Sequence, residues 1–301
     1  MRILLTGVNG LLGQHLLSLL SSKSSYEVYA TGMGVNRNLP GDYHYYPCDL
    51  TKNEKVKDLV NKVKPDYIIH SAAKTQVDWC ELNKKDCWES NVSATEYLLS
   101  ASMRYAGHFQ YISTDFVFDG KQGNYLETDP PNPVNYYGES KLAAEKLVMA
   151  SGIPWSIART VLVYGIAHQM SRSNILVWIY NSLKNNQKIR VVTDQVRTPT
   201  FVEDLAMGSS LILDKHAEGI YHISGDEIMT PYELAIKVAE FFDFNKELIE
   251  PVDGSIFSQE GKRPERTGFR IAKARKTLDF SPKNIEENFV LVADKLKNNS
   301  A

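Results

Sequence analysis

The sequence predicts an α/β fold with a doubly wound parallel sheet and a smaller C-terminal α/β lobe. Three observations predict it. A short apolar run at the N-terminus leads directly into a glycine-rich turn, strand-like and helix-like segments then alternate to about residue 165, and beyond that point helical segments are joined by short strands. Repeated β-α-β order indicates a parallel sheet with helices on both faces. We expect its crossover connections to be right-handed.

The first unit reads as strand, glycine turn and helix. The run Arg2–Thr6 precedes Gly7, Gly10 and Gly13, and leucines recur at helical spacing from Leu11 onward. Gly7 permits a tight turn, Gly10 lets the backbone approach a pyrophosphate, and Gly13 allows the helix to pack closely on the strand. The helix N-terminus offers free N–H groups to phosphates. An ordinary loop is the alternative, but this context favours a Rossmann-type dinucleotide-binding domain.

The remaining elements follow in order. Further strands are expected at Tyr26–Thr31, Tyr43–Pro47, Tyr67–Ala72, Phe109–Ser113 and Trp155–Thr160, and helices at Glu54–Lys62, Lys85–Tyr105 and Tyr136–Ala150. The second half predicts helices at Ile175–Asn185, Val202–Leu213 and Pro231–Phe242, with short strands at Arg190–Val192 and Gly219–Ile223. We therefore expect an NAD(P)-binding Rossmann domain over residues 1–165, with about 196–217 returning to it, and a substrate-binding lobe over 166–301. This lobe should close over the carboxyl ends of the strands, where open α/β sheets bind ligands.

Composition restricts the classes of partner. The 301 residues carry a net charge of −2, so electrostatics gives no reason to expect nucleic acid or an anionic membrane. No apolar run approaches ~20 residues and no cleavage site follows the apolar N-terminus, so neither a membrane span nor a signal peptide is expected. Cys48, Cys80 and Cys87 lack metal-ligand spacing, and we expect reduced thiols, no metal and a cytoplasmic location. A homodimer stays open.

One tyrosine and one lysine share a face of the expected helix Tyr136–Ala150. Tyr137 and Lys141 are four residues apart, and a lysine held beside a tyrosine lowers a phenol pKa that begins at about 10. We expect Tyr137 to act as a general acid or base, with Lys141 as its electrostatic partner. Tyr180 and Lys184 repeat the spacing, and we interpret that second pair as solvated helix surface.

The second expected strand indicates the form of the nicotinamide cofactor. NAD-preferring Rossmann proteins usually place an acid about 20 residues past the glycines. Here the strand ends in Gly32-Met33-Gly34 without an acid, and Arg37 follows. A guanidinium suits a 2′-phosphate, so NADP(H) is preferred. NAD(H), with Arg37 as a solvated loop residue, is the alternative.

Motifs spread over nearly the whole chain together resemble the extended short-chain dehydrogenase/reductase family. They are Thr6–Gly13, Cys48-Asp49-Leu50, His70–Ala73, Asn91-Val92, Ser113-Thr114-Asp115, Tyr137–Lys141, Arg159–Gly165 and Arg263-Pro264. Within this family the chain is most similar to the dTDP-4-dehydrorhamnose reductases, through Gln76-Val77-Asp78 with Glu81 and through Ser113–Gly120. It is also similar to the regulatory β subunit of methionine adenosyltransferase.

The resemblance implies a role for each matching residue. Tyr137 would transfer a proton to the sugar oxygen, Lys141 would also bind the nicotinamide ribose, and Thr114 would hydrogen-bond the same carbonyl or, alternatively, cap a turn. Asn91 would support this network, or lie at the surface. The implied cofactor-binding set is Gly7, Asn9, Gly10, Leu11, Leu12, Gly13, Arg37, Asp49, Leu50, Ala72, Ala73, Tyr137 and Lys141. In that set Asp49 would accept from the adenine amino group, or close a turn.

The substrate set implied by the resemblance is Thr75, Val77, Phe116, Arg197 and Arg263. The two arginines would bind a nucleotide diphosphate or form surface salt bridges. Nucleotide-sugar dehydratases place an acid where Phe116 stands, so elimination lacks its base, while NAD-retaining epimerases usually carry the acidic second-strand signature that is missing here. The sequence assigns no role to Asp115.

We therefore expect an NADPH-dependent reductase of a nucleotide-linked 4-keto-6-deoxy sugar. An epimerase of the extended family and a non-catalytic, cofactor-binding regulatory subunit remain alternatives. Two departures from the dehydrorhamnose reductases leave the sugar open. Leu162 stands where those enzymes carry a tryptophan, and the loop 74–77 is one residue shorter.

Overall fold

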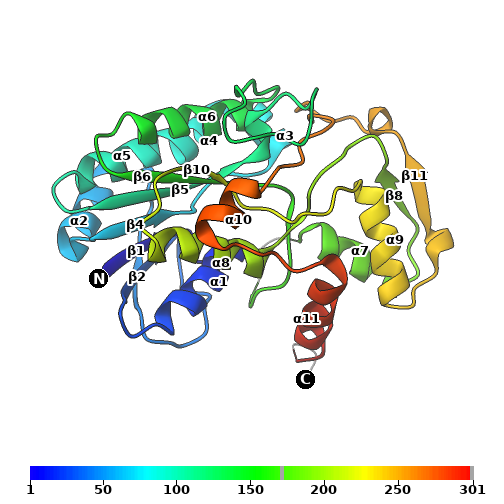
Figure 1. Cartoon of the computed structure of the whole chain (residues 1–301), viewed down its shortest axis with the longest axis horizontal. Coiled ribbons are helices and arrows are strands. Elements are labelled where there is room, and N and C mark those ends of the chain that lie inside the picture. The colour runs from blue at the N-terminus through cyan, green and yellow to red at the C-terminus, as the bar shows by residue number, and fades with distance from the viewer. Residues whose placement is uncertain (170–172, 299–301) are drawn as a thin grey trace.

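A seven-stranded parallel sheet forms the centre of the computed structural model, which describes residues 1–169 and 173–298 (Figure 1). Its strands are β1 (Arg2–Thr6), β2 (Glu27–Gly32), β3 (His44–Pro47), β4 (Tyr67–His70), β5 (His108–Thr114), β6 (Trp155–Thr160) and β10 (Gly219–His222). They lie in the order β10-β6-β5-β4-β1-β2-β3. The chain moves outward from β1 to β3 and then returns to β4, so the order reverses between β1 and β4. The predicted Rossmann-type sheet is confirmed, and this reversal is where such sheets bind ligands.

Alternating residues of each strand face two separate hydrophobic cores. Ile3 and Leu5 of β1 face one core and Leu4 faces the other, because successive side chains of a strand point to opposite faces. Helices α1 (Leu11–Ser21), α8 (Val202–Asp214) and α10 (Ala272–Leu278) cover the first face, and α2 (Asn53–Val63), α5 (Ala94–Ser102) and α6 (Tyr136–Met149) cover the second (Figure 1). Burial on both faces explains why the strands read as nearly continuous apolar runs.

A smaller lobe has its own core. It contains α7 (Ile175–Lys184), α9 (Pro231–Phe241), α11 (Ile285–Asn298) and the parallel pair β8 (Ile189–Val192) with β11 (Ile249–Val252). A second short pair, β7 (Val163–Tyr164) with β9 (Thr200–Phe201), connects it to the sheet domain. In α9 the Thr230 hydroxyl accepts from the Glu233 N–H and the Glu233 carboxylate accepts from the Thr230 N–H, which fixes where the helix begins.

Some expected elements differ from the structure. The strand expected to reach Ala72 ends at His70. The expected helix 85–105 is α4 (Lys84–Trp88), a π-helical turn at Glu89–Ser93 and α5, and a further helix, α3 (Val77–Leu82), precedes it. Of the second Tyr–Lys pair, Lys184 is exposed as predicted, but Tyr180 is half-buried, and its ring packs on Phe242 and Phe244 with centroids 4.9 and 5.5 Å away. Tertiary packing explains this, because local spacing does not show which face of a helix a second lobe covers.

The chain crosses between the two lobes more than once. After the lobe begins, α8 packs on α1 and β10 adds the seventh strand beside β6. Residues of α10 also belong to the core shared by α1 and the sheet. We propose that residues 202–223 and 271–280 belong with the sheet domain, which extends the return that the sequence led us to expect at about 196–217.

Three further features bear on the class of protein. Within residues 1–169 and 173–298, no helix is long and apolar enough to cross a bilayer. The same described residues contain no cluster of three or more His, Cys, Asp or Glu side chains suited to a metal ion. Cys48, Cys80 and Cys87 are all buried free thiols.

Candidate active site

Thr114 and Tyr137 meet at the carboxyl end of β5. Thr114 is the last residue of that strand, and Tyr137 lies in the first turn of α6. The Asn135 side chain begins α6 by accepting from the Gly138 N–H at 2.8 Å. A Cβ on Gly138 would lie 2.1 Å from the Phe116 carbonyl oxygen, so only glycine allows α6 to approach the turn after β5 this closely. This approach brings the Tyr137 phenol beside the strand end.

Burial controls the electrostatics of this pair. Tyr137 is 8% exposed, and burial raises the pKa of its phenol well above the usual value, opposed by a hydrogen bond with Thr114. Lys141 is 3% exposed, and burial lowers the pKa of its ammonium to about 7. That ammonium donates to the Ile112 carbonyl at 2.7 Å and lies 4.0 Å from the centroid of the Tyr111 ring.

The expected lowering of the Tyr137 pKa by Lys141 is therefore not found. The ammonium of Lys141 is directed toward β5, and the cost of burying a phenolate is the larger effect. In this arrangement Tyr137 is a phenol at neutral pH.

Asn91 connects the loop after β4 to α6. Its Oδ1 accepts from the Lys74 N–H at 2.7 Å, and its Nδ2 donates to the Lys74 carbonyl at 3.0 Å and to Ser140 Oγ at 2.9 Å. The side chain is 1% exposed, so the alternative that it lies at the surface is wrong. Its position in the π-helical turn gives it the reach to both partners.

The glycine turn packs against the end of β4. Gly7 has a φ of +74°, and a Cβ there would lie 2.7 Å from the Ala72 N atom. A Cβ on Gly13 would lie 2.2 Å from the Gly7 carbonyl oxygen. Three segments therefore lie together where the strand order reverses: the glycine turn, the start of α1 with Leu11 and Leu12, and Ala72-Ala73. This arrangement fits a pyrophosphate held at a helix N-terminus.

Asn9 holds the loop that carries Arg37. Its Nδ2 donates to the carbonyls of Met33 at 3.1 Å and Val35 at 2.9 Å, and its Oδ1 accepts from the Arg37 N–H at 3.1 Å. The Arg37 side chain is half-buried, and in the part of the chain that the structure describes no carboxylate forms an ion pair with it. Asp49 accepts from the Thr51 N–H at 3.0 Å and the Thr51 hydroxyl at 2.7 Å. Its contact with adenine stays a prediction.

The expected substrate residues lie in different environments. Thr75 is exposed, and Val77 and Phe116 are half-buried, with the Phe116 ring edge toward Tyr137 at a centroid distance of 6.0 Å. Arg263 is paired with Asp78, to which its Nη2 donates at 2.6 Å. The side chain of Arg263 is 17% exposed, so it remains accessible from the surface.

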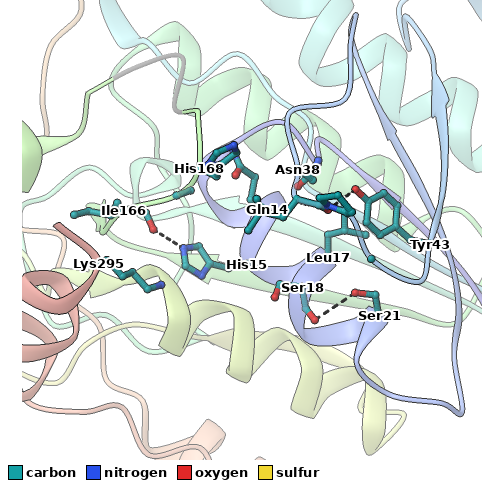
Figure 2. Close-up of a pocket in the computed structure, with 14 residues that line it drawn as sticks. Gln14, His15, Leu17, Ser18, Ser21, Asn38, Tyr43, Ile166, His168 and Lys295 are labelled. Atoms are coloured by element: carbon teal, nitrogen blue, oxygen red, sulfur yellow. Dashed lines mark hydrogen bonds between the residues drawn. The ribbon is translucent and has the colours of Figure 1, made fainter. Parts of the chain in front are cut away.

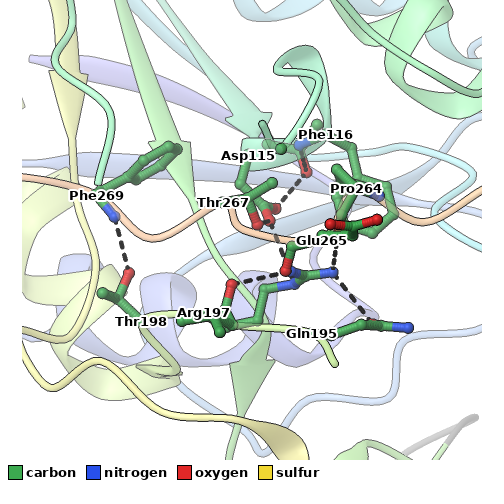
Figure 3. Close-up of polar contacts among 12 residues, drawn as sticks. Asp115, Phe116, Gln195, Arg197, Thr198, Pro264, Glu265, Thr267 and Phe269 are labelled. Carbon is green, nitrogen blue, oxygen red and sulfur yellow. Dashed lines mark hydrogen bonds and ion pairs between the residues drawn. The ribbon is translucent and has the colours of Figure 1, made fainter. Parts of the chain in front are cut away.

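Arg197 fits neither the diphosphate contact that we expected nor the alternative of a surface salt bridge. It is 3% exposed, and its terminal nitrogens donate to the carbonyls of Val196, Pro264 and Glu265 and to Gln195 Oε1 (Figure 3). These partners occupy its donors, which argues against the diphosphate contact. Asp115 and Thr267 join Arg197 in one buried cluster. Sequence reasoning missed this cluster, because the three residues are far apart along the chain.

Leu162 is partly buried, and its contact with the substrate stays a prediction. It has a φ of +37°, which is rare for a branched side chain, and it packs against the cluster around Phe118 and Phe269. Leu162 thus contributes to the packing of this cluster.

A pocket of about 310 Å³ lies beside α1 (Figure 2). Gln14, His15, Ser18, the loop at Asn38 and Lys295 of α11 are among its walls, and His15 Nε2 is 2.9 Å from the Ile166 carbonyl oxygen. None of Thr114, Tyr137 and Lys141 lines it. It is therefore not the catalytic site.

With this geometry in place, comparisons with known proteins decide the family. A family model described as the RmlD substrate binding domain matches residues 1–298. The chain belongs to this family. A dTDP-4-dehydrorhamnose reductase from Aggregatibacter actinomycetemcomitans is 30% identical over 293 residues, covering 93% of this chain and 94% of the relative. The methionine adenosyltransferase 2 subunit beta of Rattus norvegicus is 30% identical over 259 residues, covering 84% and 76%.

Solved structures agree with membership of the RmlD family. A dTDP-4-dehydrorhamnose reductase from Clostridium acetobutylicum superposes with a TM-score of 0.86 at 27% identity, covering 99% of this chain and 100% of that one. One from Bacillus anthracis, in complex with NADP, gives 0.83 at 28% identity, covering 98% and 99%. The predictions of the extended reductase family and of an NAD(P)-dependent oxidoreductase resembling dTDP-4-dehydrorhamnose reductase are thus confirmed.

Proposed function

We propose that the chain reduces the C4 carbonyl of a nucleotide-linked 4-keto-6-deoxy sugar with NADPH. The observation that carries the proposal is the burial of Tyr137 beside Thr114, which raises the pKa of its phenol. Reduction of a carbonyl requires one hydride at carbon and one proton at oxygen. A phenol whose pKa is raised by burial is in the acid form that reduction requires.

Each residue of the site has a step to perform. The nicotinamide supplies the hydride when it is bound. Tyr137 donates its hydroxyl proton to the carbonyl oxygen, and the oxygen of Thr114, which is hydrogen-bonded to the Tyr137 hydroxyl, holds the phenol in place before the transfer. Lys141 moves a positive charge to the phenolate that remains when its ammonium turns from the Ile112 carbonyl. Phe116 offers no carboxylate to take a proton from the sugar, which disfavours elimination.

NADP(H) is the cofactor that we propose. Arg37 follows a strand without a terminal acid, and Asn9 holds its loop against the glycine turn. The relative from Bacillus anthracis was solved with NADP, whereas an epimerase from Thermus thermophilus with the same fold, at 24% identity, was solved with NAD. The glycine turn fits either form, so Arg37 is the residue on which the preference depends.

Arg263 is the residue that we propose for the diphosphate of the substrate. Its guanidinium is accessible and already holds an anion, the Asp78 carboxylate, which a diphosphate would replace. Thr75 and Val77 lie next to Asp78 and would face the sugar. The three free thiols are consistent with the cytoplasmic location that we also propose.

A panel of nucleotide 4-keto sugars, dTDP-4-dehydrorhamnose among them, tests the function by NADPH oxidation at the nicotinamide absorbance. Tyr137→Phe should lower kcat by about 10²–10⁴ and leave NADPH binding unchanged. Tyr180→Phe is the matched control, because Tyr180 also stands four residues before a lysine but packs in the smaller lobe. Equal turnover of simple aldehydes, or a normal kcat for Tyr137→Phe, would refute the proposal.

A regulatory subunit is the second candidate. The rat methionine adenosyltransferase 2 subunit beta is as similar as the bacterial reductase, at 30% identity, and the short loop at 74–77 resembles that subunit. A pull-down with a methionine adenosyltransferase catalytic subunit separates the two. Complex formation with no turnover of any nucleotide sugar would favour this candidate over the reductase.

A further inference from the structure

Asp115 is a buried carboxylate that directly follows the catalytic threonine. It lies in the 3₁₀ turn Asp115–Val117 and is 3% exposed. Its Oδ1 accepts from the Thr114 hydroxyl at 3.0 Å, and the same hydroxyl oxygen accepts from the Phe116 N–H at 3.2 Å. A hydroxyl has one proton and two lone pairs. These two partners therefore fix both the rotamer of Thr114 and the direction of its proton.

The other oxygen of Asp115 faces the C-terminal segment. Its Oδ2 accepts from the hydroxyl of Thr267, which is fully buried, and lies 3.9 Å from Arg197 Nε (Figure 3). Arg197 in turn donates to the carbonyls of Pro264 at 2.7 Å and Glu265 at 2.9 Å. One carboxylate thus links the end of β5 to residues 264–267, about 150 positions further along the chain.

This segment also leads to the expected substrate site. Arg263, which pairs with Asp78 of α3, directly precedes Pro264. The backbone of the segment is held from the other side as well, since the Val196 N–H donates to the Glu265 carbonyl at 2.7 Å. A displacement of Asp115 would therefore reach both the catalytic hydroxyl and the segment that carries Arg263.

We propose that Asp115 is a positioning residue. It accepts the hydrogen bond of the Thr114 hydroxyl, so that the Thr114 oxygen keeps one lone pair directed to the Tyr137 hydroxyl, and through Thr267 and Arg197 it keeps the 264–267 segment in register with Thr114. The inference rests on the proposed reductase function. An ionised carboxylate accepts at both oxygens at once, which a neutral amide cannot do. Its uncompensated burial would be costly, and Arg197 offsets that cost. The Asp115–Arg197 pair therefore acts on the position of the Thr114 hydroxyl and of the 264–267 segment.

Asp115→Asn is the direct test, because it keeps the shape and removes one acceptor. We expect kcat on the nucleotide sugar to fall roughly tenfold to a hundredfold, the range for losing a hydrogen bond to a charged group, with KM changing less than about threefold and NADPH binding unchanged. Thr267→Val should lower kcat in the same direction, and Thr267→Ser should restore it. The double variant Asp115→Asn/Thr267→Val should lose less than the product of the two single effects.

Asp119→Asn is the matched control. Asp119 is an acid in the same loop, but it accepts from the Tyr125 hydroxyl at 2.8 Å and the Lys121 N–H at 3.0 Å and makes no contact with Thr114. We expect its kcat to remain near that of the wild type. Should Asp115→Asn fail to fold, the Thr267→Val and Thr267→Ser pair carries the test.

Several outcomes would overturn the inference: a normal kcat in Asp115→Asn, an effect on KM alone, a Thr267→Ser variant as impaired as Thr267→Val, or multiplicative single effects. Failure of the proposed function has a different signature, since the wild type would then turn over no nucleotide sugar. In that case the double-mutant cycle of Asp115→Asn and Thr267→Val is measured by urea unfolding. Non-additive changes in the free energy of unfolding would support the link between Asp115 and Thr267, and additive changes would refute it.

Discussion

Replacing Arg37 by alanine is expected to weaken NADPH binding far more than NADH binding. In the structure Arg37 is partly buried, its backbone N–H donates to Asn9 Oδ1, and among the described residues no carboxylate forms an ion pair with its guanidinium. A 2′-phosphate would therefore meet a guanidinium that is carried on a loop held by Asn9 and that has no carboxylate to give up. A hydrogen bond between charged groups contributes about 1.5–3 kcal/mol, which corresponds to a rise in the NADPH Kd of roughly tenfold to 150-fold.

Titration calorimetry with each cofactor on the same preparations measures the effect of Arg37→Ala. The NADH Kd should change by less than about twofold, because NADH lacks the 2′-phosphate. Arg190→Ala removes an exposed arginine of β8 and serves as the control, with no expected change for either cofactor. Asn9→Ala should reproduce part of the loss by freeing the loop. Equal weakening of both cofactors by Arg37→Ala would refute the reasoning.

Three further predictions concern stability. Burial lowers the pKa of Lys141 to about 7 from 10.5, so between these two pH values the unfolded chain binds one more proton than the folded chain. Without cofactor, the stability of the wild type relative to Lys141→Met should therefore increase as pH rises from 7 toward 10.5. A stability difference in urea unfolding that does not change with pH would contradict this. In the same assay, Arg159→Met should lower the free energy of unfolding by about 3–5 kcal/mol, because the buried Glu145 carboxylate loses its two donors, the Arg159 Nε and Nη2 at 2.9 and 2.7 Å. A loss below about 1 kcal/mol would contradict this prediction. Gly13→Ala should lower the free energy of unfolding by about 1–3 kcal/mol and abolish NADPH binding. Gly107→Ala is the control and should do neither, because a Cβ there would lie 3.4 Å from its nearest neighbour. Thermal melts with and without cofactor measure both effects.

The parts of the site that the sequence predicted are those set by local order. The run Arg2–Thr6 with its glycines forms β1 and the turn into α1, and Thr114 ends β5, because short-range patterns specify a strand, a turn and a helix. Tyr137 and Lys141 share α6 for the same reason. Since the carboxyl ends of parallel strands lie at one edge of the sheet, order along the chain was enough to bring these groups together.

The parts that could not be predicted depend on burial between distant segments. The raised pKa of Tyr137 follows from what covers it, and spacing to Lys141 does not contain that information. Asn91 reaches Lys74 only because a π-helical turn interrupts the expected helix. Arg197 was expected to bind the substrate diphosphate, but its donors are occupied because the carbonyls of Pro264 and Glu265 accept from it. These features need tertiary contacts across 17 to 68 positions.

The return of α8 and β10 to the large sheet has a consequence for recombination and for fragments of this chain. A cut near residue 165 would leave the β6 edge without its β10 partner and would uncover the face of α1 that α8 occupies. An unpaired edge beside exposed apolar helix surface favours association between chains. The smaller lobe therefore cannot be exchanged between relatives as an independent unit. New specificity in this architecture has to arise by substitution within an intact chain, since replacing the lobe would expose the edge and one face of the large sheet domain.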